Sequence, residues 1–471
     1  MNRPNLALAR ARSDYPTIQI PARWVVTAVA TISMLALASA PAASAAIRYA
    51  SPGGGATGAE PCLSSDPCSL PHAIEGHVPA DVNNGDQVVV LGGMGAFNPA
   101  GQINISKQID IGGAAGGPVP VINGAGTRGL NGQAGGISLH DLRIDQATGS
   151  AAFSLENSSA ERVLATYAGG TTGGACEVAE STVVRDSVCW ATGSQGAGVV
   201  NGGGIVQAKL RNVTAVGSGT GGRGIRFDSS TSSAAVEGIN VIAHGTASDV
   251  LAKTNNTVGP TASVTLTASD FASAPVSGMG SSATPPGTNG NITAPPLFAD
   301  ASAGDFHELA GAPTIDAGLA AADIGALDLD SKPRAISAIP TCTQPQPGTP
   351  DIGAFEYIPI CPSNAFSYSL KGKTLIITVQ AAGTVAVSDP ASPFEASSAK
   401  RKRRLLLKPS SASGGPGVIV VPLRLSKLAK AILGKTHKVK VGARITFTPV
   451  GGLANTQTAK LKIRTKHRKP S

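Results

Sequence analysis

Short runs in which aliphatic and polar residues alternate recur along the middle of the chain, and each soon reaches a glycine. Successive copies start 21, 24, 26, 26 and 28 residues apart, at Leu139, Ala160, Val184, Leu210, Val236 and, more weakly, Val264. Similar short runs separated by glycine turns fill residues 85–122. Alternation at a period of two predicts strands that bury one face. The sequence therefore predicts a repeated unit of one short strand and a corner.

A repeat of 20–30 residues indicates a solenoid, since one such unit cannot bury its apolar face alone. The Leu-x-x-Leu-x-Leu ladder of leucine-rich repeats is missing. Instead, Asn, Asp or Gly occupies the corner position, where Asp186 corresponds to Asn212 and Gly238 in the next copies. These residue types tolerate left-handed backbone. We therefore predict an all-β fold: a right-handed parallel β-helix.

Residues 362–471 differ from the repeats. Two apolar runs, 367–370 and 374–379, flank the turn Lys371-Gly372-Lys373 and predict a hairpin, and further strands follow. Ser426 is a candidate N-cap for a short helix ending at Gly434. About seven short strands in such a span suggest an immunoglobulin-like β-sandwich.

The first residues read as a secretory signal peptide, assigned to residues 1–45. Four arginines precede the apolar segment 24–40, and Ala43-Ser44-Ala45 is a small-residue cleavage site. An uncleaved N-terminal anchor is the alternative. Cleavage predicts a secreted, extracellular protein without a transmembrane segment, which can still associate with the cell surface.

Six cysteines remain after the signal segment, and six cysteines allow 15 pairings. They fall into three pairs that are close in sequence, and short loops close most easily. We therefore favour the disulfides Cys62–Cys68, Cys176–Cys189 and Cys342–Cys361. Disulfides fit an oxidising, extracellular setting.

Both ends of residues 62–357 resemble a known family. The run Cys68-Ser-Leu-Pro-His-Ala-Ile-Glu75, followed by Asn84-Gly-Asp-Gln-Val-Val-Val-Leu91, is similar to the N-terminal cap of secreted bacterial parallel β-helix repeat proteins. The runs Gly311–Gly318, Leu327–Asp330 with Arg334, and Asp351-Ile-Gly-Ala-Phe-Glu356 resemble the closing signatures of the "choice-of-anchor" (Q-type) kind. Ser331 replaces the usual glycine of Asp-x-Asp-Gly, and Pro71 and His72 replace the usual Arg-Glu. The resemblance implies a β-helix over residues 46–361 with an N-terminal cap and a closing anchor-type segment. It implies no catalytic residues.

Charge divides the chain at the same boundary. The net charge is +9. Residues 47–361 carry 13 Lys/Arg against 26 Asp/Glu, whereas residues 362–471 carry 21 Lys/Arg against only Asp389 and Glu395. An anionic partner is therefore expected at the basic sandwich rather than at the acidic solenoid.

Some parallel β-helices are polysaccharide lyases or glycoside hydrolases, so catalysis has to be considered. Candidate carboxylates are Asp141 and Asp145, expected on alternating positions of one strand, and Asp186, but Asp186 also fits a corner role. Ala243-His-Gly245 is the nearest fragment of a polygalacturonase pattern. The best basic cluster for a polyuronate lyase, which needs cations and a base, comprises Lys209, Arg211, Arg223 and Arg226 with Asp228.

Cofactors are not expected. The histidines show no HxH or HExxH spacing. Asp328 and Asp330 are weak candidates for a calcium site with oxygen ligands. A loop in which either carboxylate pairs with Arg334 is the favoured alternative.

The run Lys400, Arg401, Lys402, Arg403, Arg404 is the densest basic stretch of the tail. It fits a solvated loop, a contact with anionic cell-wall polymer or acidic glycan, or a protease-sensitive linker. No motif supports specific nucleic-acid recognition. Three functions stay open: a non-catalytic surface protein bound through its basic module, a polysaccharide-degrading enzyme, and a glycan-binding adhesin.

Overall fold

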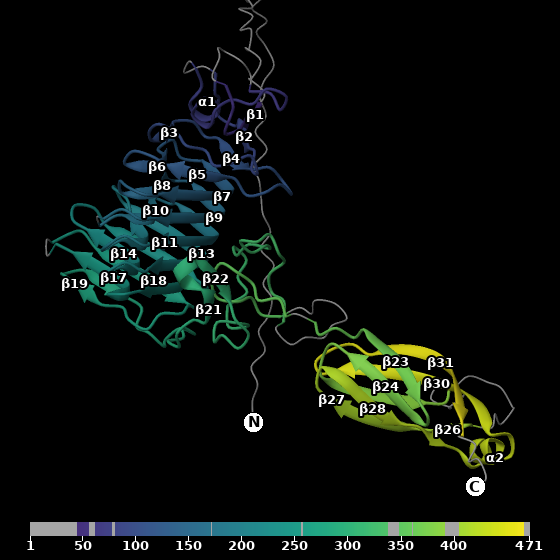
Figure 1. Cartoon of the computed structure of the whole chain (residues 1–471). Coiled ribbons are helices and arrows are strands. Elements are labelled where there is room, and N and C mark those ends of the chain that lie inside the picture. Colours follow the sequence, from purple (N-terminus) through teal and green to yellow (C-terminus); the bar gives the residue numbers. More distant parts are fainter. Residues whose placement is uncertain are drawn as a thin grey trace, which may run out of the picture. The chain divides into compact units, whose positions relative to one another are not determined.

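The computed structural model describes residues 45–55, 62–77, 81–170, 172–255, 258–337, 348–359, 361–390 and 405–465 of the 471-residue chain. It confirms the predicted all-β architecture, a parallel β-solenoid followed in sequence by a small β-sandwich (Figure 1). The predicted signal peptide lies outside the described residues, apart from Ala45. No helix within the described ranges is long and apolar enough to cross a membrane.

Two long parallel sheets run the length of the solenoid. The first, sheet A, has the order β1-β2-β4-β7-β9-β11-β13-β15-β18-β20. Its strands are β1 (Ile47–Ala50), β2 (Gln87–Val90), β4 (Asp110–Gly113), β7 (Ser138–Gln146), β9 (Ser159–Tyr167), β11 (Val183–Ala191), β13 (Val206–Gly217), β15 (Ala234–Ile239), β18 (Ala262–Thr267) and β20 (Ser281–Ala283). The second, sheet C, joins β3 (Ile103–Ile105), β6 (Arg128–Gly132), β8 (Ala151–Glu156), β10 (Gly174–Ala179), β12 (Ala197–Asn201), β14 (Arg223–Ser229), β17 (Ser248–Thr254) and β19 (Val276–Ser277).

A single left-handed residue bends each central strand of sheet A. The residues at this corner have φ between 46° and 57° and are Asp141, Arg162, Asp186, Asn212, Asn240 and Ala268. The bend lets one strand serve two faces of a coil. Thus β13 pairs with β15 before the corner and with β16 (Ile242–Gly245) after it, and β7 likewise pairs with β4 and then with β5 (Val121–Gly124).

The predicted repeat register is right for four of the five intervals. Leu139 pairs with Ala160, Ala160 with Val184, Val184 with Leu210, and Val236 with Val264. In the fifth interval, however, Leu210 pairs with Gly238 rather than with Val236.

The corner match of Gly238 is therefore wrong, because Asn240 occupies that position. A shift of two residues preserves the alternation of inward and outward side chains. The hydrophobic pattern alone could not distinguish the two registers.

Aliphatic side chains fill the solenoid interior, together with a few aromatic ones such as Phe153, Tyr167 and Phe227. The predicted Cys176–Cys189 disulfide is confirmed, and it crosses this interior from β10 to β11. Cys62–Cys68 is also confirmed. Cys361 is disulfide-bonded as well, and its predicted partner Cys342 lies outside the described residues.

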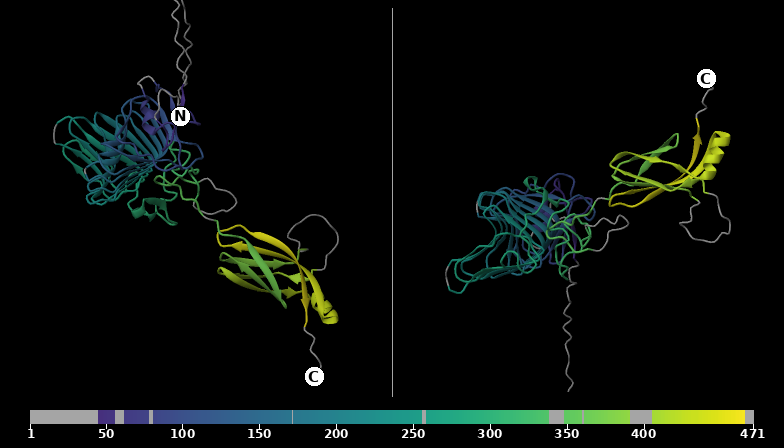
Figure 2. Two further views of the ribbon diagram at one scale, coloured as in Figure 1. Left: turned by 45° about the horizontal axis from the view of Figure 1, so that its top comes forward. Right: turned by 90° about the horizontal axis from the view of Figure 1, so that it is seen from below.

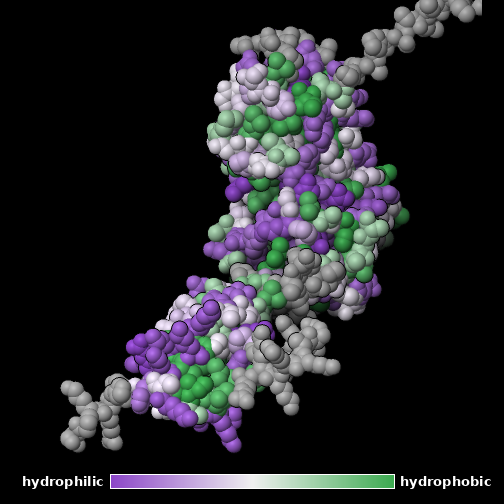
Figure 3. Space-filling view, turned by 90° about the vertical axis from the view of Figure 1, so that its right-hand side faces the viewer, coloured by the Kyte–Doolittle hydropathy of each residue, from purple (hydrophilic) through white to green (hydrophobic). Residues whose placement is uncertain are grey.

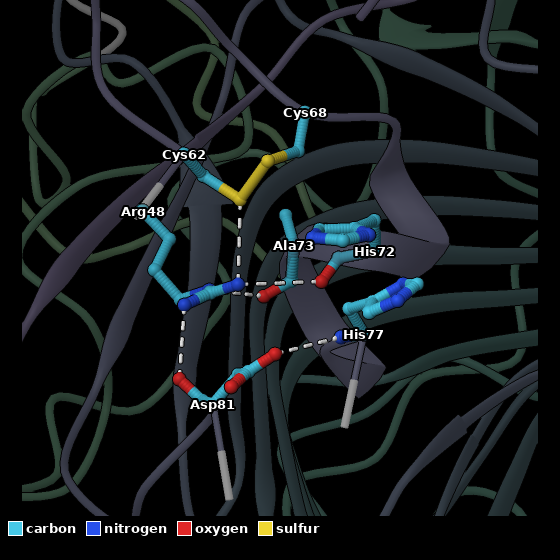
Figure 4. The surroundings of a disulfide bond; sticks show 7 residues. All are labelled: Arg48, Cys62, Cys68, His72, Ala73, His77 and Asp81. Atoms are coloured by element: carbon cyan, nitrogen blue, oxygen red, sulfur yellow. Dashed lines mark hydrogen bonds between the residues drawn. A yellow bond between two sulfur atoms is a disulfide. The ribbon is translucent and has the colours of Figure 1, made fainter. Parts of the chain in front are cut away.

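The N-terminal cap is held by a buried arginine. Figure 4 shows Arg48 beneath the Cys62–Cys68 disulfide and beside helix α1 (Leu70–Glu75). Its guanidinium donates to the carbonyls of Ala73 (2.9 Å) and Asp81 (3.0 Å) and lies 3.3 Å from Cys62 Sγ. Arg48 therefore satisfies backbone carbonyls that the cap would otherwise bury without donors.

Residues 296–357 are called here the closing segment, and its described parts, 296–337 and 348–357, return along the outer face of sheet A (Figure 2). It includes β21 (Phe298–Asp300), a 3-10 turn (Ala301–Ala303) and β22 (Asp305–Glu308). Phe306 and Phe355 pack on Val188 and Trp190, which point outward from β11. Sheet A is thus apolar on both faces where the closing segment covers it.

The sandwich has its own hydrophobic core, which shares no residue with the solenoid core. One sheet has the order β23-β24-β28, a second has β27-β25-β30-β31, and β26 pairs with β29. The strands are β23 (Phe366–Lys371), β24 (Thr374–Val379), β25 (Gly383–Ser388), β26 (Leu407–Lys408), β27 (Ser410–Gly414), β28 (Gly417–Pro422), β29 (Arg424–Leu425), β30 (Lys438–Pro449) and β31 (Asn455–Arg464).

The predicted hairpin over 367–379 and the Ser426 cap are both present. Ser426 Oγ accepts from the Ala429 N–H at 3.1 Å. Helix α2 (Lys427–Thr436) nevertheless runs past Gly434, where it was expected to end. The left-handed residue that closes it is His437, with φ of 53°. A polar residue here takes the position that glycine most often occupies.

Candidate functional site

The corner residues of sheet A form a buried polar ladder that receives the closing segment. Asn240 Nδ2 donates to Asn212 Oδ1 at 2.9 Å, and Asn212 Nδ2 donates to Asp186 Oδ1 at 2.8 Å. Arg334 Nε, from the closing segment, donates to the same Asp186 oxygen at 2.6 Å. The Asp186 side chain is 0% exposed and that of Arg334 is 2% exposed. Asp186 therefore joins the solenoid to the closing segment.

Arg334 does not pair with Asp328 or Asp330 as the sequence suggested. Besides Asp186 it bonds the carbonyl of Ala354 at 2.6 Å and lies 3.9 Å from Glu356 Oε2. Residues 148 positions apart make this contact, so no local pattern could have indicated it.

The carboxyls of the Asp351–Glu356 motif are structural acceptors within the closing segment. Glu356 accepts from the Ile336 N–H (2.7 Å) and the Asp351 N–H (3.1 Å), and Asp351 accepts from the Asp316 N–H (2.6 Å). Burial raises the pKa of Glu356 to about 7 and that of Asp351 to about 6. Shifted pKa values often mark functional sites, but these groups are buried and already hold backbone N–H donors.

A groove runs between the closing segment and the outer face of β7 and β9. Two adjoining cavities, of about 340 and 480 Å³, form it and share Val119, Arg162, Leu329 and Asp330. We call it the flank groove. Charged side chains from separate coils and from the closing segment come together there.

The ionisable groups of the flank groove are paired with one another. His307 bonds Asp305 (2.6 Å) and Asp330 (2.9 Å), and its ring stacks 3.9 Å from that of Phe355. The hydrogen bond from His307 lowers the pKa of Asp330 to about 2. That carboxylate is therefore a poor proton donor at neutral pH.

Beside the flank groove, side chains of alternating charge from successive coils form a continuous row of ion pairs. His140 lies between Asp110 (3.2 Å) and Asp141 (2.8 Å), and Asp141 accepts two hydrogen bonds from Arg162. Arg162 and Arg185 then share Glu161. The hydrogen bonds to Asp110 and Asp141 raise the pKa of His140 to about 9. The imidazole is thus a cation at neutral pH.

Asp141 and Asp145 do not lie on alternating positions of one face. Asp141 is itself the left-handed corner residue, whereas Asp145 follows the bend and pairs with Arg143 at 2.9 Å. Burial alone would raise the pKa of Asp141, but hydrogen bonds from His140 and Arg162 hold it well below its usual range.

The predicted basic cluster is divided between the two sheets. Lys209 and Arg211 belong to β13 of sheet A, while Arg223, Arg226 and Asp228 belong to β14 of sheet C. Arg211 is 2% exposed and pairs with Glu237 and Asp323, both at 2.7 Å. Arg226 lies 3.3 Å from Asp228 and donates to the carbonyl of Gln195.

Lys209 stands apart from these pairs on the outer face of sheet A. There an open groove of about 750 Å³ crosses β11, β13, β15 and β18. Its polar lining consists of Ser181, Gln207, Lys209, Glu237, Ser263, Thr265 and Thr267. We call it the outer-sheet groove.

The two calcium candidates have different surroundings. Asp328 is 1% exposed and accepts from the backbone N–H groups of Lys332 (2.7 Å) and Glu356 (3.1 Å). Asp330 bonds His307 and Lys332 Nζ. The carboxylates therefore already serve as acceptors in the closing segment, and the calcium site stays a prediction.

The basic run Lys400–Arg404 lies outside the described residues. Within the described part of the sandwich, Asp389 is the sole acid, and it is 9% exposed. Its Oδ2 accepts from the N–H groups of Leu406 (2.7 Å) and Leu407 (3.2 Å). The charged side chains on the described surface of this module are consequently almost all cations. Figure 3 shows one view of it, with hydrophilic side chains around a hydrophobic patch.

The chain was compared with protein-family models and with curated proteins. No protein-family model matches the chain, and no curated protein matches it.

Proposed function

We propose that this chain is an exported, non-catalytic β-helix protein of the choice-of-anchor kind that associates with the cell surface. In this proposal the basic sandwich binds anionic polymers, and the solenoid presents its flanks to the surroundings.

The charge of the sandwich surface carries the proposal. Residues 362–471 hold 21 Lys/Arg against two acids, and the acid that the structure describes is buried against backbone N–H groups. Such a surface attracts polyanions strongly and in a salt-dependent way. Residues 47–361 carry twice as many acids as bases and would repel the same polymers.

The pairing of charges in the flank groove supports a non-catalytic role. General acid–base catalysis needs a group whose pKa lies near the working pH and which reaches the substrate. The pKa of Asp330 is about 2 and that of His140 about 9, and both side chains are engaged in ion pairs. The carboxyls with pKa values near 7, Asp270 and Glu356, are both buried and do not reach a substrate at the surface.

Binding of the mature chain, residues 46–471, to purified anionic wall polymer tests the proposal. The matched control is residues 46–361, which keep the complete solenoid core because the sandwich core is separate. We expect binding at 50 mM salt that weakens strongly by 500 mM, and no binding by the control. Equal binding by both chains, or none by the full one, would refute the proposal.

Glycan binding without cleavage is the second candidate. The outer-sheet groove supports it, because polar side chains from four adjacent coils, most of them hydroxyls, line an open surface. A glycan array probed with residues 46–361 tests this reading, and Lys209→Ala should weaken any binding found.

The enzyme alternative is tested separately. A polysaccharide panel scored for reducing ends and unsaturated products would reveal turnover. Loss of that turnover in Arg226→Ala would place it at the predicted basic cluster, and no turnover on the whole panel would remove this alternative.

A further inference from the structure

Two neighbouring strands of the sandwich place five cations close together on one face. The antiparallel register sets Lys438 opposite Arg464 and Lys440 opposite Lys462, while Lys460 lies opposite Gly442. All five charged side chains are exposed, and the residues that alternate with them are buried. We call these five residues the lysine ladder.

Nothing in the described part of the chain neutralises the lysine ladder. None of its five side chains forms an ion pair with a described residue. Like charges placed directly opposite each other destabilise a sheet. Folding stability therefore gives no reason for this arrangement, whereas the binding of a polyanion would.

The five cations occupy one end of the face, and Arg444, opposite Thr458, is the one further charged residue that β30 and β31 place on it. Further along the same two strands, Thr446 bonds Thr456 at 2.9 Å. On the neighbouring strands Thr384 bonds Ser413 at 2.8 Å. The charge is thus concentrated in a strip that runs along the strand direction.

We propose that the lysine ladder binds a linear polymer in which phosphodiesters alternate with three-carbon polyols, lying extended along β30 and β31. This assignment rests on the proposed function, and it names the site and the ligand class. Its basis is the spacing of the charges.

Successive ladder positions on one strand are two residues, or six backbone bonds, apart, which is about 6.8 Å. A phosphodiester chain with three-carbon linkers also has six bonds between successive phosphorus atoms. When the polymer lies extended along the extended strand, successive phosphates can therefore lie beside successive ammonium groups. Lysine, a compact point charge, suits phosphate without demanding the planar geometry of a carboxylate.

Nucleic acid has a similar backbone spacing but fits this face less well. Single strands bind through aromatic side chains on which bases stack. The outward positions of β30 and β31 carry Lys, Arg, Thr and Gly, with no aromatic residue. The ladder therefore favours a polymer without bases.

The test compares three variants of residues 46–471 of equal or near-equal charge. The ladder variant carries Lys→Gln at 438, 440, 460 and 462. The control carries Lys→Gln at 371, 373, 427 and 430, elsewhere on the same module. The third variant replaces the basic run Lys400–Arg404 by Gln. Because all the replaced ladder lysines are exposed, each variant should fold, and circular dichroism with a thermal melt checks this.

Binding of poly(glycerol phosphate) is measured at 50–300 mM salt. We expect at least a tenfold loss for the ladder variant and less than a threefold loss for the control. With four or five phosphates neutralised, the log–log salt slope of the unaltered chain should be about −3. It should approach zero in the ladder variant alone.

Three results would overturn the ladder assignment while leaving the proposed function intact. They are equal losses in ladder and control variants, a loss confined to the variant in the basic run, and tighter binding of polygalacturonate or single-stranded DNA than of poly(glycerol phosphate). Failure of the unaltered chain to bind any polyanion would instead refute the proposed function itself.

Discussion

Removal of the Arg334 charge should release the closing segment from the solenoid. In Arg334→Met, Asp186 keeps its hydrogen bond from Asn212 but loses a guanidinium 2.6 Å away, in a site where its side chain is 0% exposed. Removing one partner of a buried ion pair costs about 3–5 kcal/mol. Arg185 Nε still lies 3.7 Å from the other carboxylate oxygen, and Asp186 can further limit the cost by taking up a proton.

The free energy of protonating Asp186 sets an upper limit on the loss of stability in Arg334→Met, and it makes that loss depend on pH. Neutralising an aspartate with an ordinary pKa near 3.9 costs about 4 kcal/mol at pH 7 and almost nothing at pH 4. In the variant, burial raises the pKa of Asp186 in the folded state, so stability is lost as pH rises above the unfolded pKa. We therefore expect a deficit of about 4 kcal/mol at pH 7 that shrinks to about 1 kcal/mol at pH 4.

Tryptophan fluorescence reports this step directly. Trp190 is the sole tryptophan of residues 46–471, and its ring contacts Phe306 of the closing segment at 5.6 Å between centroids. Urea titrations at pH 4 and pH 7 give the free energy of undocking. Lys332→Met is the matched control, because Lys332 is about half exposed and pairs with Asp330 at the surface. Its cost should stay below about 1 kcal/mol.

The double variant Asp186→Asn/Arg334→Met completes a double-mutant cycle. It removes both charges of the pair, so neither is left buried without its partner. It should recover about 2–3 kcal/mol of the loss at pH 7. The reasoning fails if Arg334→Met loses no more than Lys332→Met, if its deficit is the same at both pH values, or if the double variant is no more stable than the single one.

Three further predictions concern other parts of the solenoid. Burial raises the pKa of Glu308 to about 8, so between about pH 4.5 and 8 the folded chain holds a proton that the unfolded chain lacks. The free energy of unfolding should therefore fall as the pH rises across that range. In Glu308→Gln the melting temperature should depend less on pH. In Gly112→Ala the new Cβ would lie 1.9 Å from the His140 ring, so the imidazole should move away from Asp110 and Asp141. The pKa of His140, measured by NMR, should then drop from about 9 towards 6.5. Replacing Cys176 and Cys189 by Ala should lower the free energy of unfolding by about 2–3 kcal/mol, measured by urea denaturation against the unaltered chain.

Much of the candidate surface could have been found in the sequence. Lys438-Val-Lys440 and Lys460-Leu-Lys462-Ile-Arg464 show cations alternating with aliphatics, which on a strand places every charge on one face. We predicted strands there and looked for polyanion binding in the basic run 400–404 instead. What the alternation could not show is that the two strands pair with each other, and with Lys440 opposite Lys462.

The sequence by itself determined the local geometry of this protein. Alternating aliphatics made strands, Asn and Asp at one position made left-handed corners, and closely spaced cysteines at 62–68 and 176–189 made disulfides. Each of these depends on residues that are near one another in the chain. The division of charge between solenoid and sandwich is likewise a property of the sequence alone.

The tertiary structure decided which distant residues meet. A two-residue slip leaves the alternation unchanged, so only packing could place Asn240 rather than Gly238 at the corner. Val188 and Trp190 face outward from β11, a side that alternation alone would leave to solvent, and the closing segment covers them. Arg334 reaches Asp186 across 148 residues because a buried charge is strongly destabilising without a partner of opposite sign. Long-range pairing of this kind depends on the shape of the assembled coils, which no short stretch of sequence contains.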